Sequence, residues 1–386
     1  MLCNQYGLRC IGQSDRRRSD LLTLSSVPVN RVEASTYRVP TDFPESDGTL
    51  EWTSTTLVLV RASAANQTGL GYTYADNATA RLIQDLLSQV VKGQDAMATT
   101  ANWNAMVQRT RNLGRPGIVS MAISAVDSAL WDLKARLLNL PLITLLGAVR
   151  EAVPIYGSGG FTSYSAEQLQ RQLEGWVERG IPRVKMKIGR DARLDLERIR
   201  AVRRAIGPDT ELFVDANGAY SRKQALAQAE KFADLNVKWF EEPVSSDDLP
   251  GLRLLRDRAP AVMEIAAGEY GYELGYFRRM LASGAVDVLQ ADATRCGGIT
   301  GFLQVAALCE AFHLPLSAHT APALHTHVCC SATPVRHLEY FHDHVRIEGM
   351  FFDGVGPPVN GALRPDLSRP GMGIELKQAD VERFAA

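Results

Sequence analysis

Eight short runs of strand-forming residues recur along the chain from Val153 onward, and helical stretches lie between most of them. A parallel sheet needs such a helix as the crossover between neighbouring strands. Eight strand–helix units that close on themselves form a (β/α) barrel. We therefore expect an α/β fold in which this part of the chain is a modified TIM barrel. The runs begin near Val153, Arg183, Glu211, Lys238, Val262, Val286, Leu314 and His337.

Helix signals between the runs support this prediction. Ser165 is followed three residues later by Gln168, and Ser221 by Gln224, which is the spacing of a capping box at a helix N-terminus. Gly180 follows the first of these helices as a stop signal. An open doubly wound sheet also alternates strands and helices. It is disfavoured because the count is eight and no phosphate-binding glycine motif follows the first strand.

The region before the barrel has a different pattern. Residues 32–39 alternate between apolar and polar side chains, and residues 55–61 are β-branched and apolar, so both are expected to be strands. Residues 118–138 carry apolar side chains at helical spacing. Strands followed by helices predict an α+β capping domain. The polar segment 41–52, which contains a proline and a glycine, is expected to be a mobile loop.

These patterns predict four parts. An N-terminal extension covers residues 1–28, the capping domain 29–150, the barrel 151–360, and a C-terminal segment that returns to the capping domain 361–386. The extension is rich in arginine and is expected to be a flexible tail rather than a targeting segment.

Composition excludes several classes of partner. Lys and Arg number 42 and Asp and Glu number 43, so there is no electrostatic reason to expect binding to nucleic acid or a membrane surface. No apolar run is long enough for a membrane span. The six cysteines include no CxxC pair, which favours reduced thiols and a cytoplasmic protein. A zinc site at His325 and His327 is disfavoured because no further ligands accompany this H-x-H pair.

Ionisable residues stand at the ends of seven of the eight expected strands. In a TIM barrel the active site lies at these carboxyl ends. Solvated strand ends would scatter in charge type, whereas these sort into three acids on neighbouring strands, two lysines on one side and an Asp–His pair on the other. In chain order the residues are Lys185 with Lys187, Asp215 with Asn217, Glu241, Glu269, Asp292, His319 and Glu339.

The three acids predict a metal site. Asp215, Glu241 and Glu269 would converge on the barrel axis and offer oxygen ligands only. Hard oxygen donors suit Mg²⁺ rather than Zn²⁺. Glu264 is an alternative to Glu269, but the two differ by five positions and face opposite sides of a regular strand. Glu269 is favoured because it stands at the strand's end.

Two groups of residues are expected to act as bases. Lys185 and Lys187 are two apart on a strand and project to the same face, so the pKa of one should be lowered. His319 has an ordinary pKa near neutrality, and Asp292 on the adjacent strand is expected to hold its second ring nitrogen. Glu339, if protonated, would donate a hydrogen bond to a developing oxyanion.

These residues resemble the enolase superfamily, and within it the mandelate racemase subgroup. The likeness runs from about Val29 to Leu376. It is carried by the ordered set Lys-x-Lys, Asp-x-Asn, Glu-Glu-Pro, Gly-Glu, Asp, His and Glu, and by the helix 122–134 with Leu-Leu-Gly at 145–147. The resemblance implies a homo-oligomer with these site residues: Mg²⁺ ligands Asp215, Glu241 and Glu269; bases Lys187 and His319; Lys185 and Asp292 as their partners; Glu339 as the electrophilic acid; and Asn217 at the substrate.

The resemblance also implies a reaction. We expect Mg²⁺-dependent abstraction of the proton α to a carboxylate through an enediolate, leading to dehydration of a sugar acid to a 2-keto-3-deoxy acid. Racemisation or epimerisation of a 2-hydroxy acid is the alternative, and a non-catalytic binding homologue is disfavoured because no ligand or base is missing. Segment 41–52 occupies the place of the family's capping loop. Its four acids favour a substrate with one carboxylate over a di-acid.

Overall fold

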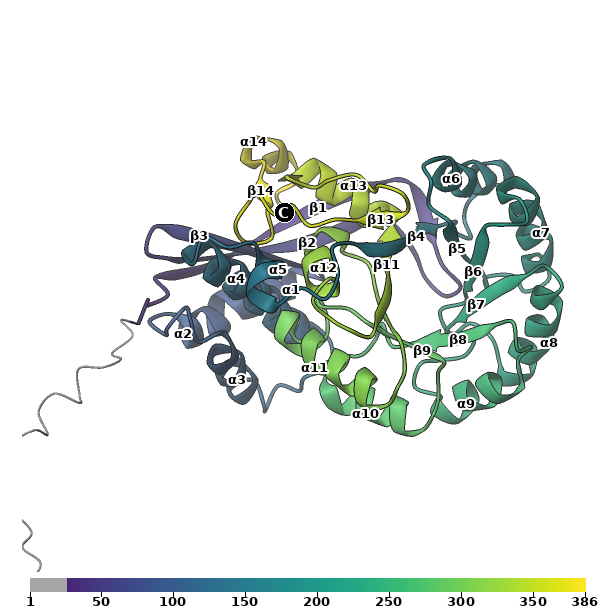
Figure 1. The fold of residues 1–386 in the computed structure, drawn as a ribbon, viewed down its shortest axis with the longest axis horizontal. Helices are drawn as coiled ribbons and strands as arrows, with labels where there is room; N and C mark the ends of the chain where they lie inside the picture. Colours follow the sequence, from purple (N-terminus) through teal and green to yellow (C-terminus); the bar gives the residue numbers. More distant parts are fainter. Residues whose placement is uncertain (1–25) are drawn as a thin grey trace, which may run out of the picture.

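The computed structural model describes residues 26–386 (Figure 1). From Val153 the chain forms a closed barrel of eight parallel strands, in which the last strand pairs with the first. This confirms the predicted barrel. Three strands begin at the predicted residue and the other five within two residues of it. The strands are β4 (Val153–Gly159), β5 (Arg183–Lys187), β6 (Glu211–Asp215), β7 (Val237–Glu241), β8 (Glu264–Ala267), β9 (Val288–Ala291), β10 (Leu316–Ala318) and β11 (Val335–Phe341).

A helix follows each barrel strand and lies on the outside of the barrel (Figure 1). Ser165 and Ser221 form the two predicted capping boxes, each with the glutamine three residues later. The helices are α6 (Ala166–Glu178), α7 (Asp195–Ile206), α8 (Arg222–Ala233), α9 (Leu249–Arg258), α10 (Leu274–Ala282), α11 (Gly298–Ala311), α12 (Pro322–Cys329) and α13 (His342–Phe351).

The capping domain is a three-stranded antiparallel sheet covered by helices, as predicted. Its central helix packs directly on the third strand. At Gly71 of that strand an added Cβ would lie 2.2 Å from the carbonyl oxygen of Ala125, so only glycine permits this close approach. The elements are β1 (Arg31–Ser46), β2 (Glu51–Ala64), β3 (Gln67–Tyr74), α1 (Asn77–Leu82), the π-helix η1 (Ile83–Leu87), α2 (Ser88–Val91), α3 (Thr99–Arg109), α4 (Ile118–Leu137) and α5 (Leu142–Leu146).

The prediction that residues 41–52 form a mobile loop is wrong. Most of the segment belongs to β1 and β2, which pair up to Ser46 and Glu51 with an irregularity between Pro40 and Glu45. The turn is closed by Asp47, whose Oδ1 accepts hydrogen bonds from the backbone N–H of the two residues after Gly48. A Cβ at Gly48 would lie 2.4 Å from the carbonyl oxygen of Ala216 in the barrel. The hairpin tip is therefore packed against the barrel mouth.

The C-terminal segment runs back to the capping domain. Ala386 N–H donates to the carbonyl oxygen of Thr36 in β1, and Arg136 of α4 pairs with Glu375 at 2.5 Å. Its elements are β12 (Phe352–Asp353), β13 (Ala362–Leu363), β14 (Glu375–Leu376), α14 (Gln378–Val381) and the 3₁₀ helix η2 (Glu382–Phe384).

The predictions about the N-terminal extension, the cysteines and membrane spans can be compared with the described residues. The arginine-rich start, with Cys3 and Cys10, lies outside the described residues. Within residues 26–386 the four cysteines are buried free thiols. Among the helices of the same range, none combines the length and hydrophobicity that a membrane span requires.

Candidate active site

The three predicted metal ligands meet at the carboxyl ends of three neighbouring strands. Asp215 ends β6, Glu241 ends β7, and Glu269 lies two residues beyond β8. All three are buried, and one oxygen from each lies within 4.8 Å of the other two. An all-oxygen donor set of this size fits Mg²⁺. Glu264, the alternative to Glu269, begins β8 at the other end of the barrel and pairs with Arg336 at 2.5 Å.

The lysine side of the triad carries Lys185 and Lys187, which project from β5 to the same interior face. Lys185 Nζ lies 2.5 Å from Glu241 Oε1 and 2.9 Å from Glu339 Oε1. Lys187 Nζ donates to Asp215 Oδ2. Both lysines are buried, and each contacts a carboxylate of the triad.

The expected lowering of a lysine pKa is wrong, because the pKa of each of the two lysines is raised. Burial opposes the charge of Lys185, but Glu241 and Glu339 outweigh it and raise its pKa well above the ordinary value. Burial likewise opposes the charge of Lys187, and Asp215 raises its pKa. The repulsion between the two ammonium groups is present but smaller than the attraction of the carboxylates on neighbouring strands.

The histidine side of the triad is built around His319, which follows β10. Its Nδ1 lies 2.8 Å from Asp292 Oδ2, and its Nε2 lies 3.2 Å from Glu269 Oε2. Asp292 is oriented by the backbone N–H of Thr294, which donates to its other oxygen at 2.6 Å. Burial opposes the imidazolium, but Glu269 and the hydrogen bond to Asp292 raise the pKa of His319 to about 9.

Glu339 of β11 lies between the two sides. Burial favours its neutral form, but Lys185 and His319 outweigh burial and lower the pKa of Glu339 to about 2. It accepts a hydrogen bond from the backbone N–H of Thr320 at 3.2 Å. The expectation of a protonated Glu339 is therefore not met in the metal-free site, where Lys185 is the hydrogen-bond donor of this pair.

Asn217 stands directly above the triad on the loop after β6. Its backbone adopts a left-handed conformation with φ 45°, which asparagine tolerates better than most residues. Its N–H donates to Asp215 Oδ1 at 2.9 Å, and its buried side-chain oxygen has no hydrogen-bond partner among the described residues. An unpartnered buried oxygen at this place is suited to a ligand.

A cavity of about 490 Å³ opens over the histidine side of the triad. The barrel contributes residues from its strand ends and loops, and the capping domain contributes the start of β2 and the end of β3. The lining includes Asn217, Glu269, Tyr270, Arg295, His319, Thr320, Phe341 and His344 from the barrel, and Asp47, Leu50, Trp52, Ser54, Thr55, Thr56, Tyr74 and Asp76 from the capping domain.

Arg295 and His344 are lining residues that the sequence analysis missed. The Arg295 guanidinium lies 3.6 Å from the carboxylates of both Glu269 and Asp292. Its position three residues after Asp292 was a signal available in the sequence, because a residue so close to a strand end faces the same mouth. His344 is the third residue of helix α13, and its approach to the cavity from outside the strand ends leaves no comparable signal.

The capping domain holds the loop that carries Asp292 and Arg295. Thr73 Oγ1 of β3 donates to the carbonyl oxygen of Thr294 at 2.8 Å. Ser124 Oγ of α4 accepts hydrogen bonds from the backbone N–H groups of Gly297 and Gly298. The histidine side of the site is thus fixed by both domains.

The acids of residues 41–52 do not form an uncompensated acidic cover. Asp42 pairs with Arg346 at 3.4 Å, and Glu51 pairs with Arg190 at 2.7 Å. Asp47 closes the hairpin turn, and burial raises the pKa of Glu45 to about 8. The physical reason that was given for a mono-acid preference therefore fails.

The H-x-H pair does not form a site. His325 Nε2 accepts a hydrogen bond from the backbone N–H of Ala293, whereas His327 Nδ1 accepts one from Ile143. Each ring therefore has its own backbone partner.

Comparison with known proteins places the chain among related sequences and folds. Residues 32–147 match the mandelate racemase / muconate lactonizing enzyme N-terminal domain, and residues 168–381 match the enolase C-terminal domain-like family. The 3,6-anhydro-alpha-L-galactonate cycloisomerase of Streptomyces coelicolor is 33% identical over 92% of this chain and 98% of its own length.

Two solved structures illustrate the likeness. A mandelate racemase/muconate lactonizing enzyme-like protein from Rubrobacter xylanophilus is 55% identical and has a TM-score of 0.91, covering 93% of this chain and 100% of that one. The L-talarate dehydratase of a Polaromonas species, complexed with Mg and L-glucarate, is 30% identical with a TM-score of 0.84, covering 94% of this chain and 98% of that one.

Proposed function

This chain belongs to the mandelate racemase/muconate lactonizing enzyme family of the enolase superfamily, and we propose that it dehydrates a sugar acid to a 2-keto-3-deoxy acid. The cofactor is Mg²⁺, which Asp215, Glu241 and Glu269 would hold. The observation that carries the proposal is the position of two bases, Lys187 and His319, each beside a different ligand of one buried acidic triad.

The two bases would address opposite faces of the substrate. Lys187 contacts Asp215 and His319 contacts Glu269, so a carboxylate seated at the triad lies between them. For a substrate whose α-proton faces Lys187, the amine removes that proton and the bonding electrons move onto the carboxylate. His319, as imidazolium, then gives a proton to the β-hydroxyl, which leaves as water. The resulting enol tautomerises to the 2-keto acid.

The charge that develops on the carboxylate must be stabilised. Bound Mg²⁺ supplies positive charge to these oxygens. Lys185, fixed by Glu241 and Glu339, adds a buried ammonium group on the same side. Asp215, which raises the pKa of Lys187, and Glu269, which with Asp292 raises the pKa of His319, both belong to the triad that would hold Mg²⁺.

Racemisation or epimerisation is a second candidate, and the same two-base arrangement favours it. If the substrate has no β-leaving group, the base on the other face can return a proton and invert the centre. If the β-oxygen belongs to a ring, the same elimination opens the ring without releasing water, which would be a cycloisomerisation as named for the Streptomyces relative.

The test is incubation of the protein and Mg²⁺ with a library of sugar acids in D₂O, followed by a ketone assay and NMR. A dehydratase gives a keto product, a racemase gives an α-deuterated epimer, and a cycloisomerase consumes a lactone or anhydro acid. If no acid exchanges its α-proton, the proposed function is wrong. A cytoplasmic location and homo-oligomeric assembly stay predictions.

A further inference from the structure

His344 occupies a position in the cavity that the reaction described above does not use. It is the third residue of α13 and lines the cavity together with His319. Its ring stacks on Tyr74 of β3, with centroids 3.4 Å apart and planes 11° apart, and the edge of Phe341 meets it at 5.1 Å. Both domains therefore fix the plane of this imidazole.

One ring nitrogen of His344 is committed to the backbone. The N–H of Ala321, two residues after His319, donates to His344 Nδ1 at 3.3 Å. A nitrogen that accepts a hydrogen bond carries no proton, so the proton of the neutral ring resides on Nε2. Burial holds the pKa of His344 well below its ordinary value, which keeps the ring neutral. Nε2–H has no hydrogen-bond partner among residues 26–386.

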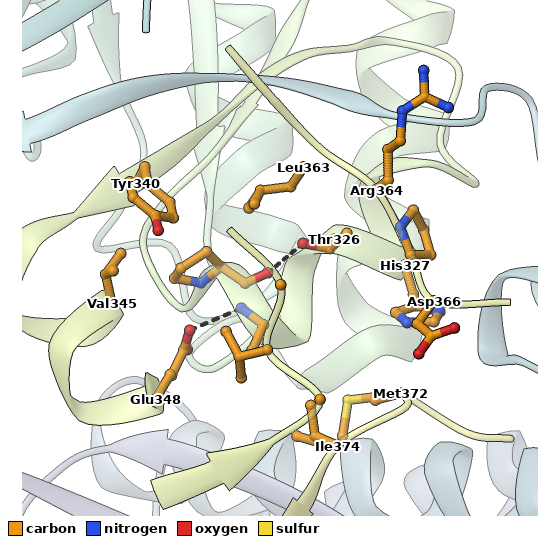
Figure 2. Close-up of a pocket in the computed structure, with 16 residues that line it drawn as sticks. Thr326, His327, Tyr340, Val345, Glu348, Leu363, Arg364, Asp366, Met372 and Ile374 are labelled. Atoms are coloured by element: carbon orange, nitrogen blue, oxygen red, sulfur yellow. Dashed lines mark hydrogen bonds between the residues drawn. The ribbon is translucent and has the colours of Figure 1, made fainter. Parts of the chain in front are cut away.

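The backbone that His344 contacts is itself strained and held from several sides. Thr320 and Ala321 both have positive φ, at 50° and 43°, which non-glycine residues adopt only when their surroundings enforce it. The start of α12 is fixed by Glu348, which accepts the N–H of Ala323 at 2.9 Å (Figure 2). Tyr72 OH donates to the same carboxylate at 2.6 Å. His344 is thus held in place independently of any ligand.

The arginine of the cavity wall is already paired with carboxylates. Arg295 faces two carboxylates at 3.6 Å, those of Glu269 and Asp292. Asp47 and Asp76 accept backbone N–H groups in the hairpin turn and at the start of α1. A second carboxylate on a substrate would meet these acids and no uncommitted cation, whereas a hydroxyl oxygen would meet hydroxyl side chains and a neutral N–H donor.

We propose that His344 is a specificity-determining residue whose Nε2–H donates a hydrogen bond to an uncharged oxygen in the tail of the substrate, selecting an aldonic acid over the matched di-acid. This inference rests on the proposed function, since it assumes that a sugar acid occupies the cavity. Tyr74, which stacks on this ring and lines the same cavity, has a buried hydroxyl that also has no partner among the described residues.

The experiment uses the full-length protein with Mg²⁺ and six-carbon aldonates paired with the aldarates of the same configuration. α-Deuterium exchange in D₂O gives kcat/KM for each acid. The aldonate with the highest value is then compared with its analogues deoxygenated at each tail carbon, for the wild type and for His344→Phe, which keeps the aromatic stack. His342→Phe, on the same helix but outside the cavity, is the matched control.

The wild type should prefer the aldonate over its aldarate by at least about tenfold, and one deoxygenation should cost about tenfold or more in kcat/KM. His344→Phe should show the loss on the intact aldonate, mainly in KM, and be insensitive to that same deoxygenation. His342→Phe should behave as the wild type.

Other outcomes overturn the inference. A preference for the aldarate refutes the selection of a mono-acid, and equal effects of deoxygenation in the wild type and His344→Phe refute the hydrogen bond. If His344→Phe does not fold, His344→Asn, which retains an acceptor for Ala321 and a shorter donor, must show a partial loss for the same oxygen. Absence of exchange with every acid would instead mean that the proposed function has failed.

Discussion

The lysine side and the histidine side of the metal site are alike in one respect and different in another. On each side a base contacts one ligand of the triad, Lys187 with Asp215 and His319 with Glu269. Behind Lys187 stands a second cation, Lys185, whereas behind His319 stands an anion, Asp292, whose orientation is fixed by a backbone N–H.

This difference shows that the proton affinities of Lys187 and His319 are set by different contacts. Burial lowers the pKa of Lys187, and among the surrounding charges Asp215 raises it and Lys185 lowers it. His319 depends on geometry as well, because its hydrogen bond to Asp292 sets the tautomer and the ring orientation. A change in the charge of the triad should alter the pKa of both Lys187 and His319. A substitution of Asp292 should alter His319 alone.

Loss of a triad ligand should have the largest effect on activity. It should abolish the difference between the lysine side and the histidine side, because both depend on the triad. Glu269→Gln keeps the volume of the side chain but removes a charged ligand, and we expect a loss of about 10³-fold in α-proton exchange on both faces. Exchange is followed by NMR in D₂O. Glu264→Gln, at the start of β8 and so at the opposite end of the barrel, should have wild-type activity.

Chelation tests the same ligand set without a mutation. A chelator should abolish exchange, and Mg²⁺ should restore it better than Zn²⁺ because the ligands are hard oxygens. Full activity in excess chelator would refute the metal assignment.

Removal of one base should separate the two sides. His319→Asn should stop reactions that need this base, with a loss of about 10²–10⁴-fold, and leave Lys187-catalysed exchange intact. Lys187→Ala should give the reciprocal pattern. The exposed residues His313 and Lys231 provide matched control substitutions. If both variants lose exchange with every substrate while keeping their fold and Mg²⁺ affinity, the residues act as one unit.

Asp292→Asn should produce a smaller and one-sided loss. Orienting partners of this kind typically contribute about 10–100-fold, and we expect that loss only for exchange on the face of His319. The measurement is again exchange into substrates of both α-configurations. An equal loss on the face of Lys187 would show that the two sides are not independent.

The smallest expected effect is a pH dependence of stability in the metal-free protein. The pKa of His319 is about 9 in the folded protein and near its ordinary value of 6.5 when unfolded. Between these two pKa values the folded state binds more protons than the unfolded state. The contribution of His319 to the free energy of unfolding is therefore fully present below pH 6.5 and is lost as the pH rises through about 9. We expect a fall of about 4 °C in Tm over this window.

Lys187 should not contribute to this pH dependence of Tm. The pKa of Lys187 is raised above its ordinary value, so it contributes no change in this window. Thermal unfolding in chelator should therefore show a flatter pH profile for His319→Asn than for the wild type. If the pH profile of Tm is the same in His319→Asn as in the wild type, a group other than His319 takes up the proton in this window.

Much of the barrel could be predicted because each strand and its terminal residue are contiguous in the sequence. The direction of the lysine pKa shifts could not be predicted in this way. Asp215 raises the pKa of Lys187 and Glu241 raises that of Lys185, and both acids come from neighbouring strands. The hairpin of β1 and β2 was mistaken for a loop because the barrel residues that pack against its turn, such as Ala216, are far away in sequence.

The packed hairpin turn at Gly48 has a thermodynamic consequence. Ordering a flexible segment costs roughly 1–2 kcal/mol per residue, and in this chain that cost falls on folding rather than on substrate association. A substrate would therefore meet a preformed cover, which favours tight binding without a large entropic penalty. Entry and product release must then occur at the edge of the hairpin or through its transient separation from Ala216, so the turnover rate becomes sensitive to how firmly this contact is held.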